Sequence, residues 1–203
     1  MDNMELIVID DYLDEAFLKE ISEDKGFWKF GYRWWDGWWS SPIEDNRHRL
    51  IKNIWGKVPS SITLYGGPIA GFEHWVGITN PDTKGKTVWN QRYSLPPHMD
   101  KDEEYWYKHP LGKFGGNDDT SFKHPVIGTI FYVEEPVEGG YLRIWDEHFK
   151  DINENTMFES IKPKRNRLII FDASKTHAVT EVTKGERKAI AINIWSHIPE
   201  EFK

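Results

Sequence analysis

Three side chains that can bind a metal ion have the most informative spacing in this sequence. His98 and Asp100 lie two positions apart, and a second histidine, His177, follows far downstream. Residues i and i+2 of an extended strand point to the same face, so the first imidazole and the carboxylate should reach one ion from the same side. Two imidazoles and one carboxylate form a facial ligand set with open coordination positions, as in non-heme Fe(II) centres. The spacing therefore predicts a metal centre made of these three residues.

The segment that follows His177 predicts a ligand pocket beside this metal centre. Residues 187–195 alternate with a period of two: three isoleucines share one face, whereas Arg187, two alanines, Asn193 and Trp195 share the other. Alanines leave space that a larger side chain would fill, and a guanidinium binds a carboxylate through two parallel hydrogen bonds. We therefore expect a cavity for a small dicarboxylate, with Arg187 holding one of its carboxylates.

With these motifs the sequence resembles the Fe(II)- and 2-oxoglutarate-dependent oxygenases, within them the prolyl 4-hydroxylase-like group. The family pattern is His-x-Asp, a distal histidine and a basic residue ten positions later. The matching residues here are His98, Asp100, His177 and Arg187. Further matches are the strand-like residues 128–133, the Gly-Gly-x-Leu motif at 139–142, and residues 167–172 before the distal histidine. The resemblance covers residues 88 to 198, and the first 85 or so residues match only loosely.

The resemblance implies an enzyme that uses Fe(II), 2-oxoglutarate and dioxygen. The three metal ligands would hold Fe(II), and 2-oxoglutarate would be converted to succinate while a substrate C–H bond is hydroxylated. Ascorbate would support turnover as a reductant. Related halogenases replace the carboxylate ligand with a small residue, so the presence of Asp100 favours hydroxylation.

The resemblance also implies which residues bind 2-oxoglutarate. Arg187 would hold the carboxylate that lies away from the metal. In the family an aromatic hydroxyl donates to the same carboxylate, and two donors suit a carboxylate in a pocket of low dielectric constant. Tyr132 matches this position, Tyr93 is the alternative, and Leu142 would line the cosubstrate cavity.

The substrate is less well defined by the sequence. The resemblance favours a prolyl residue in a peptide or protein. Three alternatives stay open: a free amino acid or small metabolite, an alkylated nucleobase, and a metal-binding β-helix module without turnover. The net charge of −7 disfavours nucleic acid, because phosphate binding requires clustered lysine and arginine. The complete ligand set together with Arg187 disfavours a module without activity.

Composition indicates a single soluble domain of 203 residues, a length at which all-β folds often form one unit. The absence of cysteine excludes disulfides and thiolate metal sites. No stretch approaches the length of a membrane span, and the short apolar run at 6–9 does not fit a signal peptide. We therefore expect a cytoplasmic enzyme without a membrane partner.

The predicted elements indicate a mainly β protein with flanking helices, built on a double-stranded β-helix, a cupin-like jelly roll. Residues 1–85 form its helical, tryptophan-rich part, and residues 86–198 its metal-binding β core. Helices are expected from Asp14, as N-cap, to 24, with Gly26 as the stop, and over 47–55. Strands are expected over residues 6–9, 87–94, 98–100, 124–134, 140–145, 167–172 and 187–196.

Two segments could cover the metal centre. Residues 27–39 are unusually rich in tryptophan, and both a core role and a substrate flap are open interpretations. Residues 101–123 are long, polar and directly follow the proximal ligands, which predicts a lid. The other six histidines are expected to have no chemical role: His48, His74, His109, His124, His148 and His197.

Overall fold

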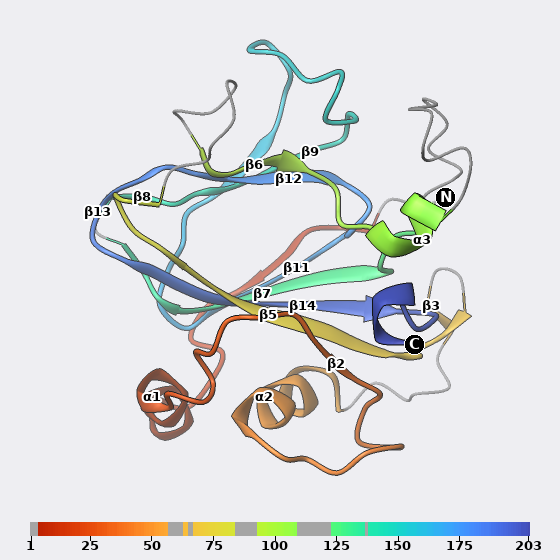
Figure 1. Cartoon of the computed structure of the whole chain (residues 1–203). Helices are drawn as coiled ribbons and strands as arrows, with labels where there is room; N and C mark the ends of the chain where they lie inside the picture. The colour runs from red at the N-terminus through yellow and green to blue at the C-terminus, as the bar shows by residue number, and fades with distance from the viewer. Residues whose placement is uncertain (1–3, 57–62, 65–66, 84–92, 109–122, 137) are drawn as a thin grey trace.

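The computed structural model describes residues 4–56, 63–64, 67–83, 93–108, 123–136 and 138–203. Two antiparallel sheets face each other, and helices α1 (Glu15–Glu23) and α2 (Asn46–Trp55) lie on the outer side of the larger sheet (Figure 1). This arrangement confirms the predicted mainly β jelly roll with flanking helices. Within the described part of the chain, no helix has both the length and the apolar character required to cross a bilayer.

The larger sheet is built around one long central strand, β14 (Arg187–Trp195). Along its whole length β14 pairs with β5 (Gly71–Thr79), and on its other side with β7 (Ile127–Glu134). The remaining strands are β11 (Arg167–Phe171), β1 (Ile7–Ile9) and β2 (Arg33–Trp35), with β1 and β2 at the two edges. Since side chains alternate along a strand, β14 presents its isoleucines to the helices and its arginine and alanines to the other sheet.

The smaller sheet carries the two histidines of the predicted metal centre. Its strands, in spatial order, are β10 (Glu159–Ile161), β9 (Leu142–Trp145), β12 (Thr176–Thr180) and β6 (Tyr93–His98). Shorter elements are β3 (Thr63–Leu64), β4 (Gly67–Pro68), α3 (Glu103–Lys108), β8 (Glu138–Gly139), β13 (Val182–Lys184) and the 3-10 helix η2 (Glu200–Phe202). Apolar side chains of β7, β9, β10, β11 and β14 form the core between the sheets.

Helix α1 packs on the larger sheet through an apolar stripe. Leu18 and Ile21 are fully buried in the same cluster as the isoleucines of β14. The carboxylate of Asp14 accepts a hydrogen bond from the backbone N–H of Phe17 at 2.9 Å, which confirms the predicted N-cap. The predicted stop at Gly26 was wrong by two residues, because the helix ends at Glu23 and Asp24 is its C-cap.

The tryptophan-rich segment belongs mostly to the core between the larger sheet and α2. Trp35 is 3% exposed and stacks on His48 of α2 with ring centroids 4.3 Å apart. Trp38 and Trp39 pack against Phe72 of β5. Burial of these rings supplies apolar area to the core, so the tryptophans do not form a flap.

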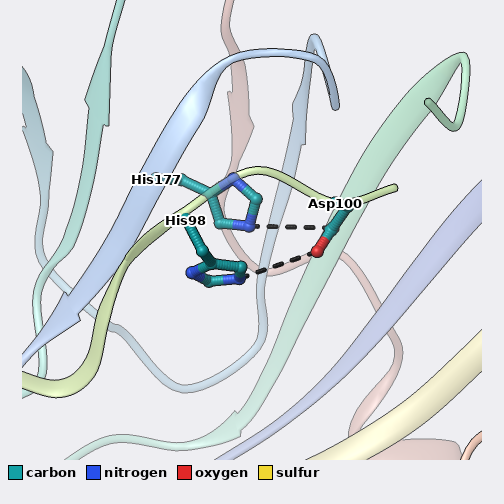
Figure 2. A group of neighbouring side chains, drawn as sticks. All are labelled: His98, Asp100 and His177. Atoms are coloured by element: carbon teal, nitrogen blue, oxygen red, sulfur yellow. Dashed lines mark ion pairs between the residues drawn. The ribbon is translucent and has the colours of Figure 1, made fainter. Parts of the chain in front are cut away.

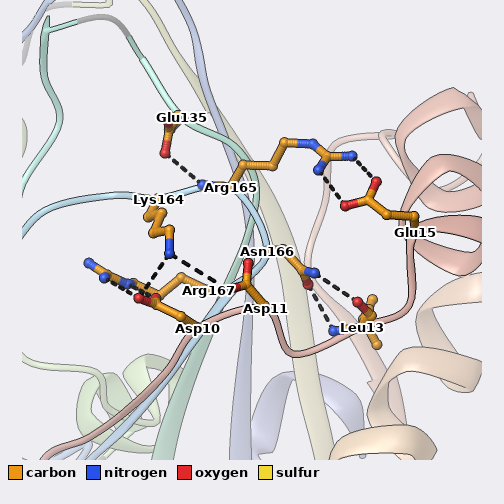
Figure 3. A network of polar contacts seen from close by, with 9 residues as sticks. All are labelled: Asp10, Asp11, Leu13, Glu15, Glu135, Lys164, Arg165, Asn166 and Arg167. Atoms are coloured by element: carbon orange, nitrogen blue, oxygen red, sulfur yellow. Dashed lines mark hydrogen bonds and ion pairs between the residues drawn. The ribbon is translucent and has the colours of Figure 1, made fainter.

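The turn between β10 and β11 ties the N-terminal strand and helix to the sheet (Figure 3). Asn166 has a positive φ of 62° and exchanges two hydrogen bonds of 2.8 Å with the backbone of Leu13. Beside it Arg167 binds the carboxylate of Asp10 at 2.6 Å, and this contact lowers the pKa of Asp10 below its ordinary value. The N-terminal part is therefore fastened to the β core by side chains that face the turn.

Several predicted boundaries need correction. The strand expected over 98–100 ends at His98, so Asp100 lies beyond it. The segment 101–123, predicted as a lid, contains helix α3, and its residues 109–122 lie outside the described residues. Residues 87–92 of another expected strand also lie outside them. The expected strands at 124–134 and 140–145 begin later, at Ile127 and Leu142. Strands β2, β5 and β10 and the short β3, β4, β8 and β13 were not predicted.

Candidate metal centre and cosubstrate pocket

The three predicted ligands come together between the sheets. His98 ends β6, His177 lies opposite it on β12, and Asp100 follows β6 by two residues. One ligand atom from each residue lies within 4.8 Å of the other two. The Nε2 atoms of His98 and His177 are 3.6 and 3.7 Å from the two carboxylate oxygens of Asp100, and both imidazoles point toward it (Figure 2). These separations exceed hydrogen-bond lengths, so the three side chains face a shared space.

Backbone carbonyls fix the orientation of both imidazoles. Nδ1 of His98 lies 2.8 Å from the carbonyl oxygen of Pro96, and Nδ1 of His177 lies 3.0 Å from that of Lys175. A carbonyl only accepts, so each Nδ1 carries the proton and each Nε2 keeps a free lone pair. This second hydrogen bond is typical of metal-bound histidine.

The electrostatics also suit a metal cation. Burial by itself would raise the pKa of Asp100, but His177, His98 and the amide of Asn193 together hold it well below its usual range. Burial lowers the pKa of His177. Burial also opposes protonation of His98, but Asp100 outweighs it and raises the pKa of that imidazole. The cluster therefore offers an ionised carboxylate and a neutral His177, and a metal ion that binds would displace a proton carried by His98.

A cavity of about 220 Å³ extends from these ligands between the two sheets. It is smaller than the roughly 300–1,000 Å³ pockets that hold drug-sized ligands, so it suits a small metabolite. Ala189, Ala191 and Gly77 form part of its wall, and their small size leaves the space open. Leu142, predicted to line the cosubstrate cavity, is fully buried and does line it.

Arg187 lies in the wall of this cavity with two unpaired hydroxyl groups near it. The arginine is 5% exposed, and its guanidinium lies 4.9 Å from the ring centroid of Tyr132. Thr79 is its direct partner across the β5–β14 pairing. The Nε of Arg187 and the hydroxyls of Tyr132 and Thr79 are buried without a hydrogen-bond partner in the described part of the chain. Buried polar groups are nearly always paired, so three orphaned donors mark a place where a polar ligand fits.

Sequence reasoning did not identify Thr79. Its position opposite Arg187 depends on the pairing of β5 with β14, which the sequence did not reveal. Neither Tyr132 nor the alternative, Tyr93, is among the residues that line the cavity. Tyr132 lies beside Arg187 with an unpaired hydroxyl, whereas the hydroxyl of Tyr93 accepts a hydrogen bond of 3.0 Å from Arg143.

Aromatic side chains border the cavity on the side of the tryptophan-rich segment. Phe30 is 74% exposed and lines the cavity together with Trp75 of β5. The ring of Tyr32, 60% exposed, packs on Trp75 with centroids 4.9 Å apart. Part of the segment 27–39 therefore borders the cavity, although its tryptophans do not form a flap.

The residues present fit both Fe(II) and 2-oxoglutarate. The two imidazole nitrogens and the carboxylate form the facial set of non-heme iron sites. The orphaned donors at Arg187 fit a carboxylate, and the cavity that this arginine lines also contains all three ligands.

Comparisons with known proteins agree with this geometry. The sequence signature of the 2OG-Fe(II) oxygenase superfamily matches residues 87–197. No curated protein sequence matches the chain.

Three similar solved structures share the fold at low identity. A Pseudomonas putida prolyl-4-hydroxylase is 12% identical, with a TM-score of 0.51, over 94% of this chain and 84% of that one. A viral collagen prolyl hydroxylase from Paramecium Bursaria Chlorella virus-1 is 15% identical, with a TM-score of 0.50, over 98% and 99%. A prolyl hydroxylase from Trichoplax adhaerens, in complex with a peptide fragment of the hypoxia inducible factor oxygen degradation domain, is 17% identical, with a TM-score of 0.55, over 94% and 83%.

The signature covers more than half of the 203 residues and includes both histidines, the aspartate and the arginine that surround the cavity. The chain thus belongs to the 2OG-Fe(II) oxygenase superfamily and is a 2-oxoglutarate-dependent dioxygenase.

Proposed function

We propose that this dioxygenase hydroxylates a prolyl residue in a peptide or protein. The proposal rests on one cavity that contains a facial metal-ligand set and a buried arginine. Exposed aromatic rings border this cavity. The Trichoplax adhaerens structure, which has the same fold, holds a peptide fragment. In this proposal the reaction takes place in the cytoplasm.

In this proposal His98, Asp100 and His177 hold Fe(II), which when bound supplies the activation of dioxygen and the oxidation of the substrate C–H bond. The protein fixes the three ligands before the metal binds. The carbonyls behind the two histidines hold Nδ1 and direct each Nε2 at the shared space. The two imidazoles come from paired strands of one sheet, which limits their relative movement.

Arg187 binds the carboxylate of 2-oxoglutarate that lies away from the metal. A guanidinium and a carboxylate form two parallel charge-assisted hydrogen bonds, and the hydroxyls of Tyr132 and Thr79 can donate to the remaining lone pairs. Apolar contacts from Leu142 and Ile130 complete the wall and exclude water from the cosubstrate. Orientation of the cosubstrate is thus set by the strands themselves.

The aromatic border of the cavity favours a peptide substrate over a nucleic acid. Phe30, Tyr32 and Trp75 offer flat apolar faces on which a proline ring can pack. Nucleic-acid binding relies on clustered cations, whereas this chain has a net charge of −7. The apolar contact also predicts that substrate affinity changes little between low and moderate salt.

The direct test is incubation with Fe(II), 2-oxoglutarate, ascorbate and proline-containing peptides in air. We expect succinate to form and a peptide to gain one oxygen atom by mass spectrometry, with the modified residue assigned by fragmentation. His177→Ala should abolish both signals. Succinate release together with oxygen gain only on free amino acids or nucleobases would overturn the prolyl proposal. No succinate under any condition would argue against the assigned metal and cosubstrate sites.

A further inference from the structure

Asp100 differs from the other two proposed metal ligands because it does not belong to a strand. The backbone of β6 ends at His98, and the carbonyl oxygen of Asp100 lies 2.6 Å from Nδ1 of His124. No ladder of backbone hydrogen bonds therefore fixes the direction of this carboxylate. An aspartate side chain with several available rotamers needs another contact to keep one orientation.

Asn193 of the opposite sheet supplies that contact. It lies on the cavity face of β14, is 2% exposed, and its Nδ2 donates a 3.0 Å hydrogen bond to Oδ2 of Asp100. The two histidine ligands lie on the smaller sheet, whereas this hydrogen bond comes from the larger one. The third ligand is thus held from across the cavity.

A second carboxyl group lies beside Asn193. Glu73 is the direct partner of Asn193 on β5 and is 7% exposed, so its carboxyl is buried next to the same amide. The indole N–H of Trp195 donates to Glu73 at 2.9 Å. Burial raises the pKa of Glu73 to about 8, so at neutral pH it is mostly uncharged and does not repel Asp100. These residues form a continuous buried row from Trp195 through Glu73 and Asn193 to the ligand.

We propose that Asn193 is a positioning residue that fixes the orientation of the Asp100 carboxylate for metal binding. The inference rests on the proposed metal centre. An amide donor on one carboxylate oxygen restricts rotation of the group and directs its free lone pairs toward the two Nε2 atoms. Hydrogen-bond partners of metal ligands typically change metal affinity by about 10- to 100-fold when they are removed.

The test measures metal affinity directly, without turnover. Mn(II) binding is followed by calorimetry, and the visible spectrum of the Co(II)-loaded protein reports the ligand geometry, in wild type, Asn193→Leu and Asn193→Val. Leucine resembles asparagine in size but has no donor, and valine, which also has none, suits a strand if the leucine variant does not fold. We expect Mn(II) to bind about 10- to 100-fold more weakly in both variants, with a changed Co(II) spectrum.

Asn166→Ala is the matched control, because Asn166 is a similarly buried asparagine whose side-chain amide binds the backbone of Leu13, away from the metal centre. It should lower the melting temperature and leave Mn(II) affinity unchanged. Wild-type Mn(II) affinity in either folded Asn193 variant, or an equal loss in Asn166→Ala, would overturn the proposal. His177→Ala distinguishes failure of the Asn193 proposal from failure of the metal-centre assignment. If this variant binds Mn(II) as well as wild type, the metal centre is misassigned, independent of the result for Asn193.

Discussion

Replacement of Arg187 with alanine tests the proposed cosubstrate site most directly. Arg187 is 5% exposed, and without it a bound carboxylate would lose its charged bidentate partner. Truncation of one member of a buried charge pair costs about 2–5 kcal/mol. We expect the lower part of this range, about 2–3 kcal/mol, because the hydroxyls of Tyr132 and Thr79 still donate. That corresponds to a roughly 30- to 150-fold higher 2-oxoglutarate requirement.

The assay is succinate formation as a function of 2-oxoglutarate concentration, together with direct binding of 2-oxoglutarate to the Mn(II)-loaded protein without oxygen. Lys188→Ala is the matched control, since Lys188 is the adjacent cation on β14 but pairs with Glu134 and Glu186 outside the cavity. It should leave the requirement within about twofold of wild type, well below the tenfold change that 1.4 kcal/mol produces. Arg187→Lys should show an intermediate loss, because it keeps the charge but not the planar pair of donors.

An unchanged 2-oxoglutarate requirement in Arg187→Ala would refute the assignment of the carboxylate to this residue. If Lys188→Ala instead raised the requirement, the register of β14 relative to the cavity would be wrong. A drop in maximal rate without a change in 2-oxoglutarate affinity would also contradict the proposed role, because an anchoring residue acts on binding.

Three further predictions follow from the same contacts. Tyr132→Phe and Thr79→Val should each weaken 2-oxoglutarate binding by about 1–3 kcal/mol, seen as a roughly 5- to 150-fold higher requirement in succinate formation. A requirement equal to wild type would remove that hydroxyl from the site. Phe30→Ala should weaken peptide-coupled turnover and spare slow conversion of 2-oxoglutarate without substrate; an equal loss of both would place this ring outside substrate contact. Burial lowers the pKa of His74 to about 3, whereas the imidazole of the unfolded chain has a pKa of 6.5. The stability contributed by the neutral buried imidazole is therefore present above pH 6.5. It is lost as the pH falls from 6.5 toward 3, by about 1.4 kcal/mol per pH unit. Between pH 6.5 and 5 the free energy of unfolding, measured with urea, should therefore fall by about 2 kcal/mol less in His74→Leu than in wild type. An equal fall in both proteins would contradict a neutral buried imidazole.

The chemistry-bearing residues could be predicted because their signals are local in the sequence. The period of two over residues 187–195 placed Arg187 and the two alanines on the cavity face, and the structure agrees. His98 and Asp100 were predicted to converge, and they do, but not because both lie in one strand. The carboxylate reaches the site from beyond the strand end, and a hydrogen bond from another sheet orients it.

Strand β5 escaped prediction because both of its faces are covered. Phe72, His74 and Val76 face the helices, whereas Glu73 and Trp75 face the other sheet. Polar residues therefore occur on each side, and the alternation of apolar and polar residues that marks a half-exposed strand is absent. Without β5, neither the Glu73–Asn193 contact nor the position of Thr79 opposite Arg187 could be inferred.

In the tryptophan-rich segment, too, the sequence did not reveal which side chains are buried and which line the cavity. Composition alone could not separate core residues from residues that line the cavity, and the structure contains both kinds. Trp35 is buried against α2, whereas Phe30, five residues earlier, is exposed and lines the cavity. The difference arises because Trp35 belongs to the edge strand β2, which pairs with β5, and Phe30 precedes that strand.

Strand β14 links the two halves of the proposed site. Arg187 begins the strand and Asn193 lies six residues later on the same face, so both reach the cavity only in one register. A slip of one residue would turn both side chains away and bring isoleucines into the cavity. Pairing with β5 and β7 along its length opposes such a slip. Point variants at these two positions should therefore separate cosubstrate binding from metal binding, whereas any change that shifts β14 should abolish both together.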